Sequence, residues 1–285
     1  MNEAPLQVSQ LFIHPIKSCA GIAVDEARLI ETGFEFDRAW MVVDRHRDFV
    51  TQREMPRLAL VQCRLRSDEL ILRAPGMLAL HVRCDTVEGE CQVRVWDDLV
   101  NAFDMGDLAA QWFSDFLGER VRLARFDPEW RRLANAEWTG SREAPTAFAD
   151  GFPLLVVSTA SLAELNRRLT AAGQDAVTMQ RFRPNIVIEG WPDAHAEDFI
   201  DTLAIDSPDG VVVIKLVKPC GRCTIPDVDP ASAEQGHRVT DAMSAYRAEP
   251  RIGGALAFGQ NAVIISGFEN RLRVGARAQA TLAFS

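Results

Sequence analysis

The sequence predicts a predominantly β protein of the α+β class, arranged in two domains. Short apolar runs separated by turn residues recur from Val8 to about Val95, a spacing typical of strands. Only two longer stretches repeat apolar residues at helical spacing. Between those stretches, residues 126–149 lose regular periodicity and carry mixed charges. We therefore predict a first domain of residues 1–125 and a second of residues 126–285.

The first domain contains predicted strands and one helix. The strands are expected at residues 8–14, 39–44, 61–65, 70–73, 78–84 and 121–124. Ser67 and Asp68 supply the turn of a hairpin between the third and fourth of these. In residues 78–84, alternation places three apolar side chains on one face: Leu78, Leu80 and Val82.

A helix is expected at residues 104–117 because apolar side chains recur every four residues, at Leu108, Trp112 and Phe116. Gly118 provides its C-terminal stop.

The second domain begins with a predicted buried strand at residues 151–158 and a helix at 161–169. Ser161 and Glu164 match a capping box at the start of this helix. Further strands are expected at residues 181–188, 211–217, 261–265 and 279–284. In the first of these, period-two alternation places polar side chains together on one face: Arg181, Arg183 and Asn185.

The overall composition excludes several classes of protein. Of 285 residues, 47% are hydrophobic and 25% charged, which is typical of a globular protein. A net charge of −9 would repel nucleic acid, so we expect no nucleic-acid partner. No targeting peptide and no run of about 18 apolar residues is visible, so we expect a cytoplasmic protein without a membrane partner. Six cysteines at irregular spacing favour free thiols in a reducing compartment.

The feature richest in chemistry is a C-x-x-C pair, Cys220 and Cys223, directly after the apolar run Val211–Val217. In a thioredoxin-like motif the second cysteine lies on a long helix. Pro226 and Pro230 follow Cys223 closely, and proline disfavours a helix interior by about 3 kcal/mol. We therefore expect no such helix here.

Three interpretations of the cysteine pair remain open. The two thiols could pack as small hydrophobic groups. They could hold structural zinc, although Cys84 and Cys91 are poorly spaced as a second ligand pair. Alternatively, Cys223 alone could bind a soft transition metal as a thiolate, favoured by the positive charge of Arg222.

A second polar cluster lies near the N-terminus, in His14–Gly21 and Phe34–Trp40. Lys17 and Ser18 occupy a turn, and their ammonium and hydroxyl groups suit a phosphate. The simpler interpretation makes Lys17 a solvated turn residue and Arg38 a member of a surface ion pair with a nearby carboxylate.

Five motifs follow one another along the chain: H-P-I-K-S-C-A-G, F-D-R-A-W, F-A-D-G-F-P-L-L-V-V-S, F-R-P-N-I-V-I and C-G-R-C-T-I-P-D-V-D-P. Taken in this order, they give the chain a resemblance to the MOSC-domain family, named for the C-terminal domain of molybdenum cofactor sulfurase. Within that family it is most similar to bacterial hydroxylaminopurine-detoxifying proteins and the mitochondrial amidoxime reducing component. The resemblance implies an N-terminal β-barrel domain packed on a MOSC β-barrel domain with a few helices.

The same resemblance implies a molybdenum cofactor (molybdopterin), with Cys223 as the metal ligand and the catalytic cysteine. Other matched positions would contact the cofactor: Lys17, Ser18, Arg38, Arg183 and Asn185, and also Asp150, Ser158 and Asn166. Cys220 would be a neighbour that does not bind the metal, and Asp229 either a supporting carboxylate or a turn residue. Pyridoxal phosphate, another ligand associated with the family, is not favoured.

Family membership implies reduction of N-hydroxylated compounds such as hydroxylaminopurines, amidoximes and hydroxylamines. No cysteine follows Cys223, so no ferredoxin-type domain is expected, and electrons would come from a ferredoxin-, flavodoxin- or cytochrome-type donor. The alternatives are a carrier of the cofactor or its sulfur without turnover of its own, and an interaction module stabilised by zinc.

Overall fold

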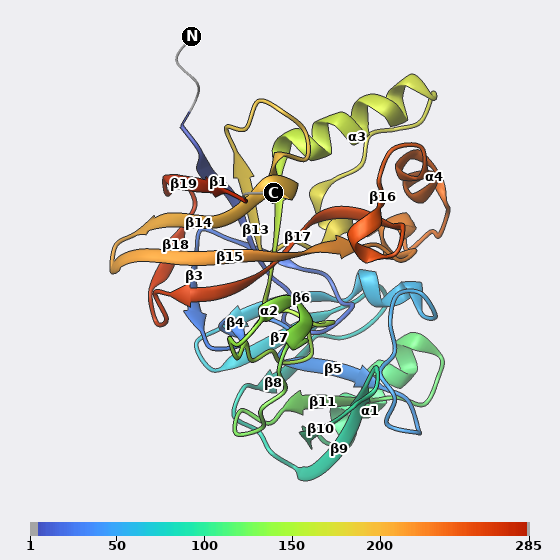
Figure 1. Ribbon diagram of the computed structural model, residues 1–285. Coiled ribbons are helices and arrows are strands. Elements are labelled where there is room, and N and C mark those ends of the chain that lie inside the picture. Colours follow the sequence, from blue (N-terminus) through green and yellow to red (C-terminus); the bar gives the residue numbers. More distant parts are fainter. Residues whose placement is uncertain (1–4, 284–285) are drawn as a thin grey trace.

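The computed structural model describes residues 5–283 and is dominated by strands (Figure 1). Strands account for 41% of the structure and helices for 19%, which confirms the predominantly β, α+β prediction. The α-helices are α1 (Asp107–Leu117), α2 (Ala136–Thr139), α3 (Thr159–Ala171) and α4 (Arg238–Ser244). Short 3-10 helices are η1 (Pro56–Leu60), η2 (Met179–Phe182), η3 (Ala196–Phe199), η4 (Ile225–Asp227) and η5 (Pro250–Ile252).

The strands are β1 (Gln7–Ile13), β2 (Ile22–Val24), β3 (Glu26–Ile30), β4 (Gly33–Phe34), β5 (Trp40–Val43), β6 (Gln62–Arg66), β7 (Glu69–Arg73), β8 (Leu80–Arg83), β9 (Gly89–Val95), β10 (Asp98–Asp104), β11 (Arg122–Phe126), β12 (Leu154–Ser158), β13 (Ile186–Glu189), β14 (Ile200–Ser207), β15 (Gly210–Gly221), β16 (Ala248–Glu249), β17 (Ala255–Ser266), β18 (Arg271–Arg273) and β19 (Ala278–Leu282).

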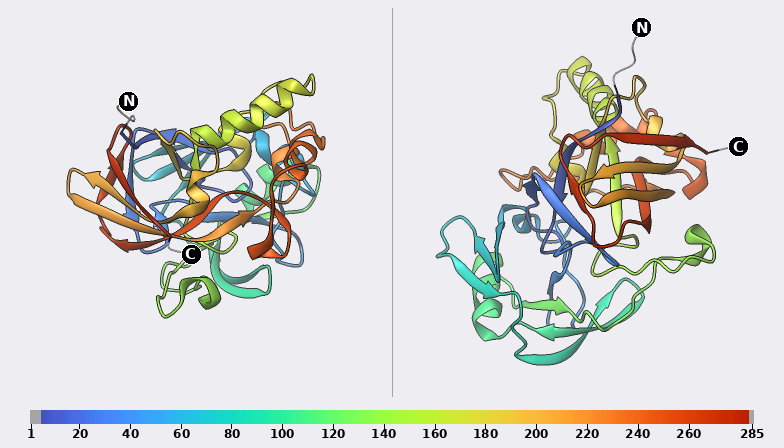
Figure 2. Two further views of the ribbon diagram at one scale, coloured as in Figure 1. Left: turned by 45° about the horizontal axis from the view of Figure 1, so that its top comes forward. Right: turned by 90° about the vertical axis from the view of Figure 1, so that its left-hand side faces the viewer.

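The largest sheet has nine strands, eight of which follow the order β19-β14-β15-β17-β12-β13-β1-β2, while β16 pairs with β17. The β12–β13 pair is parallel, and the other pairs are antiparallel. The sheet curls on itself, because the amide of Val8 in β1 donates to Ala276 (2.9 Å) and that of Ala278 in β19 to Leu6 (2.8 Å). Figure 2 shows this curled sheet with α3 lying across it. The result is barrel-like, as the resemblance implied.

Alternation within β15 explains why this segment is a strand. Val212, Ile214 and Leu216 point into the interior and are buried. Lys215 points outward and pairs with Asp201 on the neighbouring strand β14. The inward side chains join a core of apolar residues from both sides of the curled sheet.

The first part of the chain forms a four-stranded sheet, β5-β11-β10-β9, and a three-stranded sheet, β6-β7-β8. Helix α1 packs between them, and Gly118 ends it in the left-handed conformation (φ 76°), as predicted. Two leucines that the sequence places on the apolar faces of these elements are not buried: Leu78 is 89% exposed and Leu108 is 73% exposed. The strand β8 begins only at Leu80, and α1 begins at Asp107, so both leucines lie at element ends outside the packed stretch.

Two predictions about local conformation are also wrong. Ser158, and not Ser161, is the N-cap of α3, because its hydroxyl accepts a hydrogen bond from the amide of Ser161 at 3.0 Å. Residues 181–188 do not form one extended strand: η2 ends at Phe182, Arg183 is left-handed (φ 55°), and β13 starts at Ile186. Pro184 disfavours the right-handed helical region for Arg183, which is why the chain turns there.

Strand pairing crosses the predicted domain junction. β1 and β2 belong to the sheet that is otherwise built from residues after 150, and β3 pairs with β18. In Figure 1 the dark blue β1 therefore lies among yellow and orange strands, while most of the cyan and green segments lie below them. The division at residue 125 stays a prediction.

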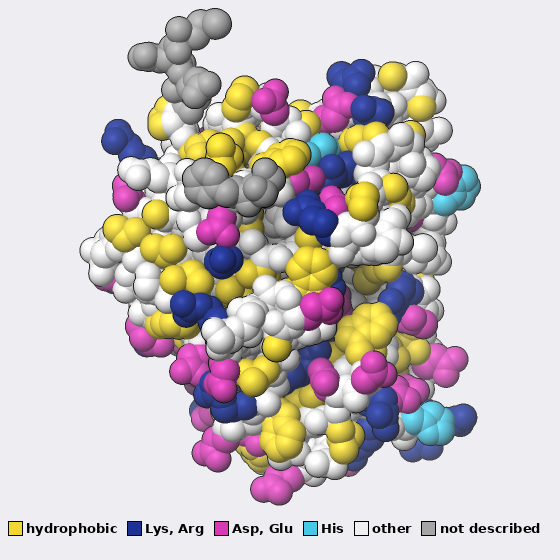
Figure 3. Space-filling view, viewed as in Figure 1, with side chains coloured by type: hydrophobic (Ala, Val, Ile, Leu, Met, Phe, Trp, Pro, Cys, Tyr) yellow, Lys and Arg dark blue, Asp and Glu magenta, His cyan; other side chains and the backbone are white. Residues whose placement is uncertain are grey.

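Charged side chains of both signs are interspersed on the face shown in Figure 3, and no large basic patch gathers there. Among residues 5–283, no helix is both long enough and apolar enough to cross a membrane.

Candidate functional site

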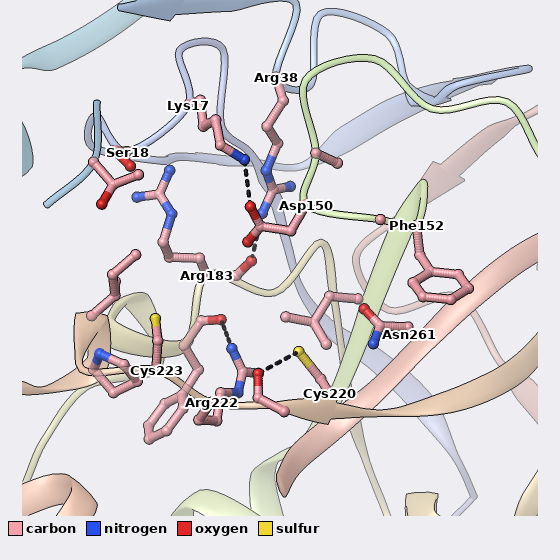
Figure 4. Close-up of a pocket in the computed structure, with 18 of the residues that line it drawn as sticks. Lys17, Ser18, Arg38, Asp150, Phe152, Arg183, Cys220, Arg222, Cys223 and Asn261 are labelled. Atoms are coloured by element: carbon pink, nitrogen blue, oxygen red, sulfur yellow. Dashed lines mark hydrogen bonds and ion pairs between the residues drawn. The ribbon is translucent and has the colours of Figure 1, made fainter. Parts of the chain in front are cut away.

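A cavity of about 560 Å³ lies at one end of the curled sheet. Several chain segments meet there, among them four whose strands begin or end at this edge: the turn after β1, the segments before β12 and β13, and the end of β15. The C-x-x-C pair and the N-terminal polar cluster, which are about 200 residues apart in sequence, therefore share one pocket (Figure 4).

Most of the site residues expected from the sequence line this pocket: Lys17, Ser18, Arg38, Asp150, Arg183, Asn185 and Cys223. Ser158 and Asn166 lie elsewhere. The buried hydroxyl of Ser158 caps α3, and the amide group of Asn166 bonds both backbone groups of Val177, at 2.7 and 2.9 Å. Both side chains are therefore engaged in holding α3 and the segment after it, and neither belongs to the candidate site.

Lys17 is not a solvated turn residue. Its side chain is 7% exposed, and its ammonium donates to the carbonyl of Phe148 (2.9 Å) and to Oδ1 of Asp150 (2.5 Å). Burial lowers the pKa of Lys17, and the nearby Asp150 carboxylate partly offsets this. For Asp150, enclosure by the cavity walls alone would raise the pKa, but the charge and hydrogen bond of Lys17 lower it to about 2. Lys17 thus fixes the segment before β12 to the turn after β1.

Arg38 has a similar positioning role. Its guanidinium pairs with Asp37 at 2.5 Å, but both side chains are largely buried, so this is no surface ion pair. It also donates to Oδ1 of Asn185 (3.1 Å) and to the carbonyl of Arg183 (2.9 Å). Arg38 therefore ties the chain before β5 to the chain before β13.

Arg183 is a pocket cation with unused hydrogen-bonding capacity. Its Nη1 donates to the carbonyl of Cys19 at 2.6 Å, while its buried Nη2 has no hydrogen-bond partner among residues 5–283. No carboxylate of the described chain pairs with it. Burial and the neighbouring charge of Arg38 lower the pKa of Arg183 to about 10. A buried donor without a partner is uncommon and costs about 1–3 kcal/mol, so this guanidinium is suited to an anionic ligand.

Unusual backbone conformations gather at the pocket. Four of the nine non-glycine residues with positive φ among residues 5–283 line it: Ser18 (68°), Arg38 (48°), Trp96 (56°) and Arg183 (55°). Such conformations cost about 1–3 kcal/mol each and cluster at functional sites. Gly21, which ends the first motif, is explained by packing, since a Cβ there would lie 2.5 Å from Cε1 of His14.

The two thiols differ in environment. Cys220, at the end of β15, is half-buried against apolar side chains, and burial raises its pKa. Cys223 lies just beyond the strand and is exposed to the pocket, so the interpretation of both cysteines as packed hydrophobic groups is wrong. No α-helix begins directly after Cys223, as predicted: the 3-10 turn η4 comes first, and α4 starts only at Arg238. Among the described residues, no three histidine, cysteine or acidic side chains gather as metal ligands, which leaves the zinc interpretation without further protein ligands.

The effect of the positive charge of Arg222 on Cys223 stays a prediction, and the hydrogen bonds of Arg222 show a further, structural role. The guanidinium of Arg222 donates to the carbonyl of Phe182 (2.9 Å) and twice to that of Phe258 (3.0 and 2.5 Å). Arg222 therefore holds the cysteine loop against η2 and β17, as Figure 4 shows for its contact at the pocket floor.

Asp229 supports the same loop from outside the pocket. Its Oδ2 accepts a hydrogen bond from Arg181 at 2.5 Å, and its Oδ1 accepts from the amide of Ala231 at 2.8 Å. Arg181 also donates to the carbonyl of Pro226 (3.1 Å). The sequence left open whether Asp229 is a turn residue or a supporting carboxylate. It is both, because it accepts from a backbone amide of its own turn and also binds Arg181.

Several residues that line the pocket are not predicted as site residues by any sequence motif. Trp96, at the tip of the β9–β10 hairpin, donates from Nε1 to Oδ1 of Asp150 at 3.3 Å. Phe152, Lys218 and Asn261 form another part of the lining. No local motif surrounds Trp96 or Asn261, so only the three-dimensional pairing of strands reveals them.

The pocket thus combines an unpaired buried guanidinium on one side with an exposed thiol on another. In Figure 4, Arg183 lies on the side of Lys17 and Ser18, and the sulfur atom of Cys223 points into the pocket below them. A thiolate is a ligand for soft metals, and a cation with free donors suits a phosphate. The residues present therefore fit a group that has a soft metal at one end and an anion at the other.

Fold and pocket together define a two-part β protein with a cationic, thiol-bearing cavity. Residues 6–120 match the MOSC N-terminal beta barrel domain, and residues 143–277 match the MOSC domain. The chain belongs to the MOSC-domain family.

Curated relatives include mitochondrial amidoxime reducing component 2 of Bos taurus, 38% identical over 232 residues, covering 78% of this chain and 66% of that protein. Mitochondrial amidoxime-reducing component 1 of Homo sapiens is 35% identical over 250 residues, covering 84% and 72%. Molybdenum cofactor sulfurase of Bos taurus is 27% identical over 257 residues, covering 84% and 29%. The chain thus spans about two thirds of the length of the amidoxime-reducing relatives.

Proposed function

We propose that the protein binds a molybdenum cofactor in this pocket and uses it to reduce N-hydroxylated compounds. The names of the relatives support the reaction class, since two are amidoxime-reducing components and one is a molybdenum cofactor sulfurase. The observation that carries the proposal is the pairing, in one cavity, of the exposed Cys223 thiol with the unpartnered Arg183 guanidinium.

Each pocket residue then has a task in holding the cofactor. Cys223 would bind the metal as a thiolate, and Arg183, with Ser18, would contact the terminal phosphate. Lys17, Arg38 and Asn185 hold the surrounding segments through the hydrogen bonds described above. When bound, the cofactor supplies the two-electron redox chemistry. In the net reaction the N–O bond of an amidoxime breaks, two electrons and two protons are consumed, and an amidine and water are released.

The electrons would come from a separate ferredoxin-, flavodoxin- or cytochrome-type protein. The bovine and human relatives are both named as components, which supports such an arrangement. A carrier of the cofactor or of its sulfur, without turnover of its own, is the second candidate. It is favoured by the similarity to a cofactor sulfurase and by the cysteine exposed in the cavity.

The test measures molybdenum content and amidoxime reduction. Protein from a host that makes the cofactor is analysed for molybdenum and assayed for benzamidoxime reduction with a chemical electron donor. We expect near-stoichiometric molybdenum and turnover in the wild type, and loss of both in Cys223→Ser.

The matched control is Cys220→Ser, which removes a thiol of the same pocket and should keep its molybdenum. Molybdenum without turnover would favour the carrier. Absence of molybdenum from wild-type protein made in that host would overturn both the reductase and the carrier proposal.

A further inference from the structure

The pocket contains a second cationic point, Lys218, away from Arg183. The ammonium of Lys218 lies 5.2 Å from the ring centroid of Trp138 and 5.8 Å from that of Phe152. Figure 4 shows Phe152 and Asn261 on the side of the pocket away from Ser18, beside Cys220. Positive charge thus stands at two separate places in the cavity wall.

Lys218 lacks a counter-ion. Lys215, three residues earlier on the same strand, pairs with Asp201 at 3.2 Å. By contrast, the ammonium of Lys218 forms neither an ion pair nor a hydrogen bond with any of residues 5–283. Aromatic rings attract an ammonium through their faces, but they leave most of its three N–H donors unused. The ammonium is therefore fixed in position and still able to bind an anion.

A second polar group lies next to it. Asn261 on β17 is the cross-strand partner of Lys218, so the two side chains project from the same face of the sheet. Both residues line the pocket, and the amide group of Asn261 has no hydrogen-bond partner among the described residues. Phe152 adds a flat apolar surface beside them. An ammonium, an amide and a ring together match a planar molecule with an anionic substituent.

We propose that Lys218, assisted by Asn261, makes the site selective for N-hydroxylated substrates that carry an anionic group on a planar ring. The proposal rests on the proposed function for its reaction, and it adds the class of substrate. Arg183 and Ser18 serve the cofactor, whereas Lys218 and Asn261 serve the substrate.

The experiment compares a neutral and an anionic substrate, benzamidoxime and para-carboxybenzamidoxime, with rates normalised to the molybdenum content of each preparation. In wild-type protein we expect a higher kcat/KM for the carboxylated substrate. In Lys218→Met the ratio of the two kcat/KM values should fall about tenfold, the factor that corresponds to about 1.4 kcal/mol. Lys218→Glu should reverse the preference. The control is Lys215→Met, which removes the paired lysine outside the pocket and should leave the ratio unchanged.

A second readout does not depend on turnover. Binding of para-carboxybenzamide, which has no N–O bond to reduce, is measured by calorimetry and should weaken about tenfold in Lys218→Met but not in Lys215→Met. If neither substrate is turned over, the proposed function fails, while this binding measurement still decides the role of Lys218. An unchanged substrate ratio together with unchanged binding in Lys218→Met overturns the inference. Loss of molybdenum from Lys218→Met also overturns it, because the ammonium would then serve the cofactor.

Discussion

The ammonium of Lys17 and the carboxylate of Asp150 meet at 2.5 Å, joining segments 133 residues apart in the sequence. The pair is asymmetric, since the lysine side chain is 7% exposed and the aspartate side chain 72% exposed, toward the cavity. Removing the carboxylate would therefore leave a buried positive charge, whereas removing the ammonium would leave a carboxylate that water can reach.

This pair gives the protein an acid-sensitive contribution to stability. The pKa of Asp150 is lowered from 3.8 to about 2, so its contribution is present above pH 4 and is lost as the pH falls through 2. We expect Asp150→Asn to lower the free energy of unfolding at neutral pH by about 1 kcal/mol, a value reduced for the exposure of the carboxylate. Its stability should then fall less between pH 4 and 2 than that of the wild type. Urea unfolding across this pH range tests the expectation.

The control for that measurement is Asp97→Asn, an exposed aspartate without an ion pair in residues 5–283. This variant should follow the wild type at each pH. Identical pH dependence of Asp150→Asn and wild type would contradict the prediction.

Arg183 should dominate the binding of anions by cofactor-free protein. Because Nη2 of Arg183 is a buried donor without a partner, pyrophosphate should gain a charge-assisted hydrogen bond there. We expect Arg183→Met to raise the Kd for pyrophosphate about tenfold, measured by calorimetry. Arg64→Met, at an exposed position of β6, is the matched control and should bind as the wild type does. Equal affinity of Arg183→Met and wild type would show that the anion binds elsewhere.

Ser158 should matter for stability and not for the cofactor. Its hydroxyl caps α3 and also contacts the Ser161 hydroxyl at 2.7 Å. Loss of an N-cap costs about 1 kcal/mol, so Ser158→Ala should lower the free energy of unfolding by that amount in a urea titration. Its molybdenum content should match that of the wild type. Ser141→Ala, at an exposed loop position, should change neither quantity. If the Ser158→Ala protein folded but lacked molybdenum, the prediction would be wrong, and Ser158 would belong to the cofactor site.

The six thiols should react with iodoacetamide in an order set by their burial. Cys223 is exposed and should be alkylated first. Burial raises the pKa of Cys63 to about 12 and that of Cys19 well above its usual value, so both should remain protonated and react last at pH 8. Mass spectrometry of peptides after timed labelling gives the order. In denatured protein the differences should disappear, and early labelling of Cys19 in folded protein would contradict the structure.

Short sequence motifs anticipated much of the fold and part of the site. Alternation located the strands because it reflects burial on one face, as in β15. Neither strand alternation nor helical spacing shows where an element stops being covered, so Leu78 and Leu108 match the apolar faces although they lie at exposed element ends. Two serines three residues apart, Ser158 and Ser161, both suited a helix cap, and only the observed hydrogen bond distinguishes them.

The rest of the site depends on contacts between distant segments. The sequence identifies Lys17 and Arg183 as site residues because they lie in compact local motifs. It does not show that Lys17 forms an ion pair while Nη2 of Arg183 has no hydrogen-bond partner, because both facts follow from tertiary packing. Trp96 reaches Asp150 only because the β9–β10 hairpin folds toward the segment before β12. The sequence indicates the charge of Arg222 beside Cys223, but its hydrogen bonds to Phe258, which hold the cysteine loop, depend on tertiary packing.

The pairing of β1 with β13 has a consequence for how the chain can fold. Residues 7–11 pair with residues 186–189, so β1 cannot form its native hydrogen bonds until most of the polypeptide has been synthesised. A fragment starting at residue 126 would lack β1 and expose the edge of β13, an open template for aggregation. The two segments that sequence comparison separates should therefore reach the native state in a single cooperative event, and neither should be obtainable alone as a stable protein.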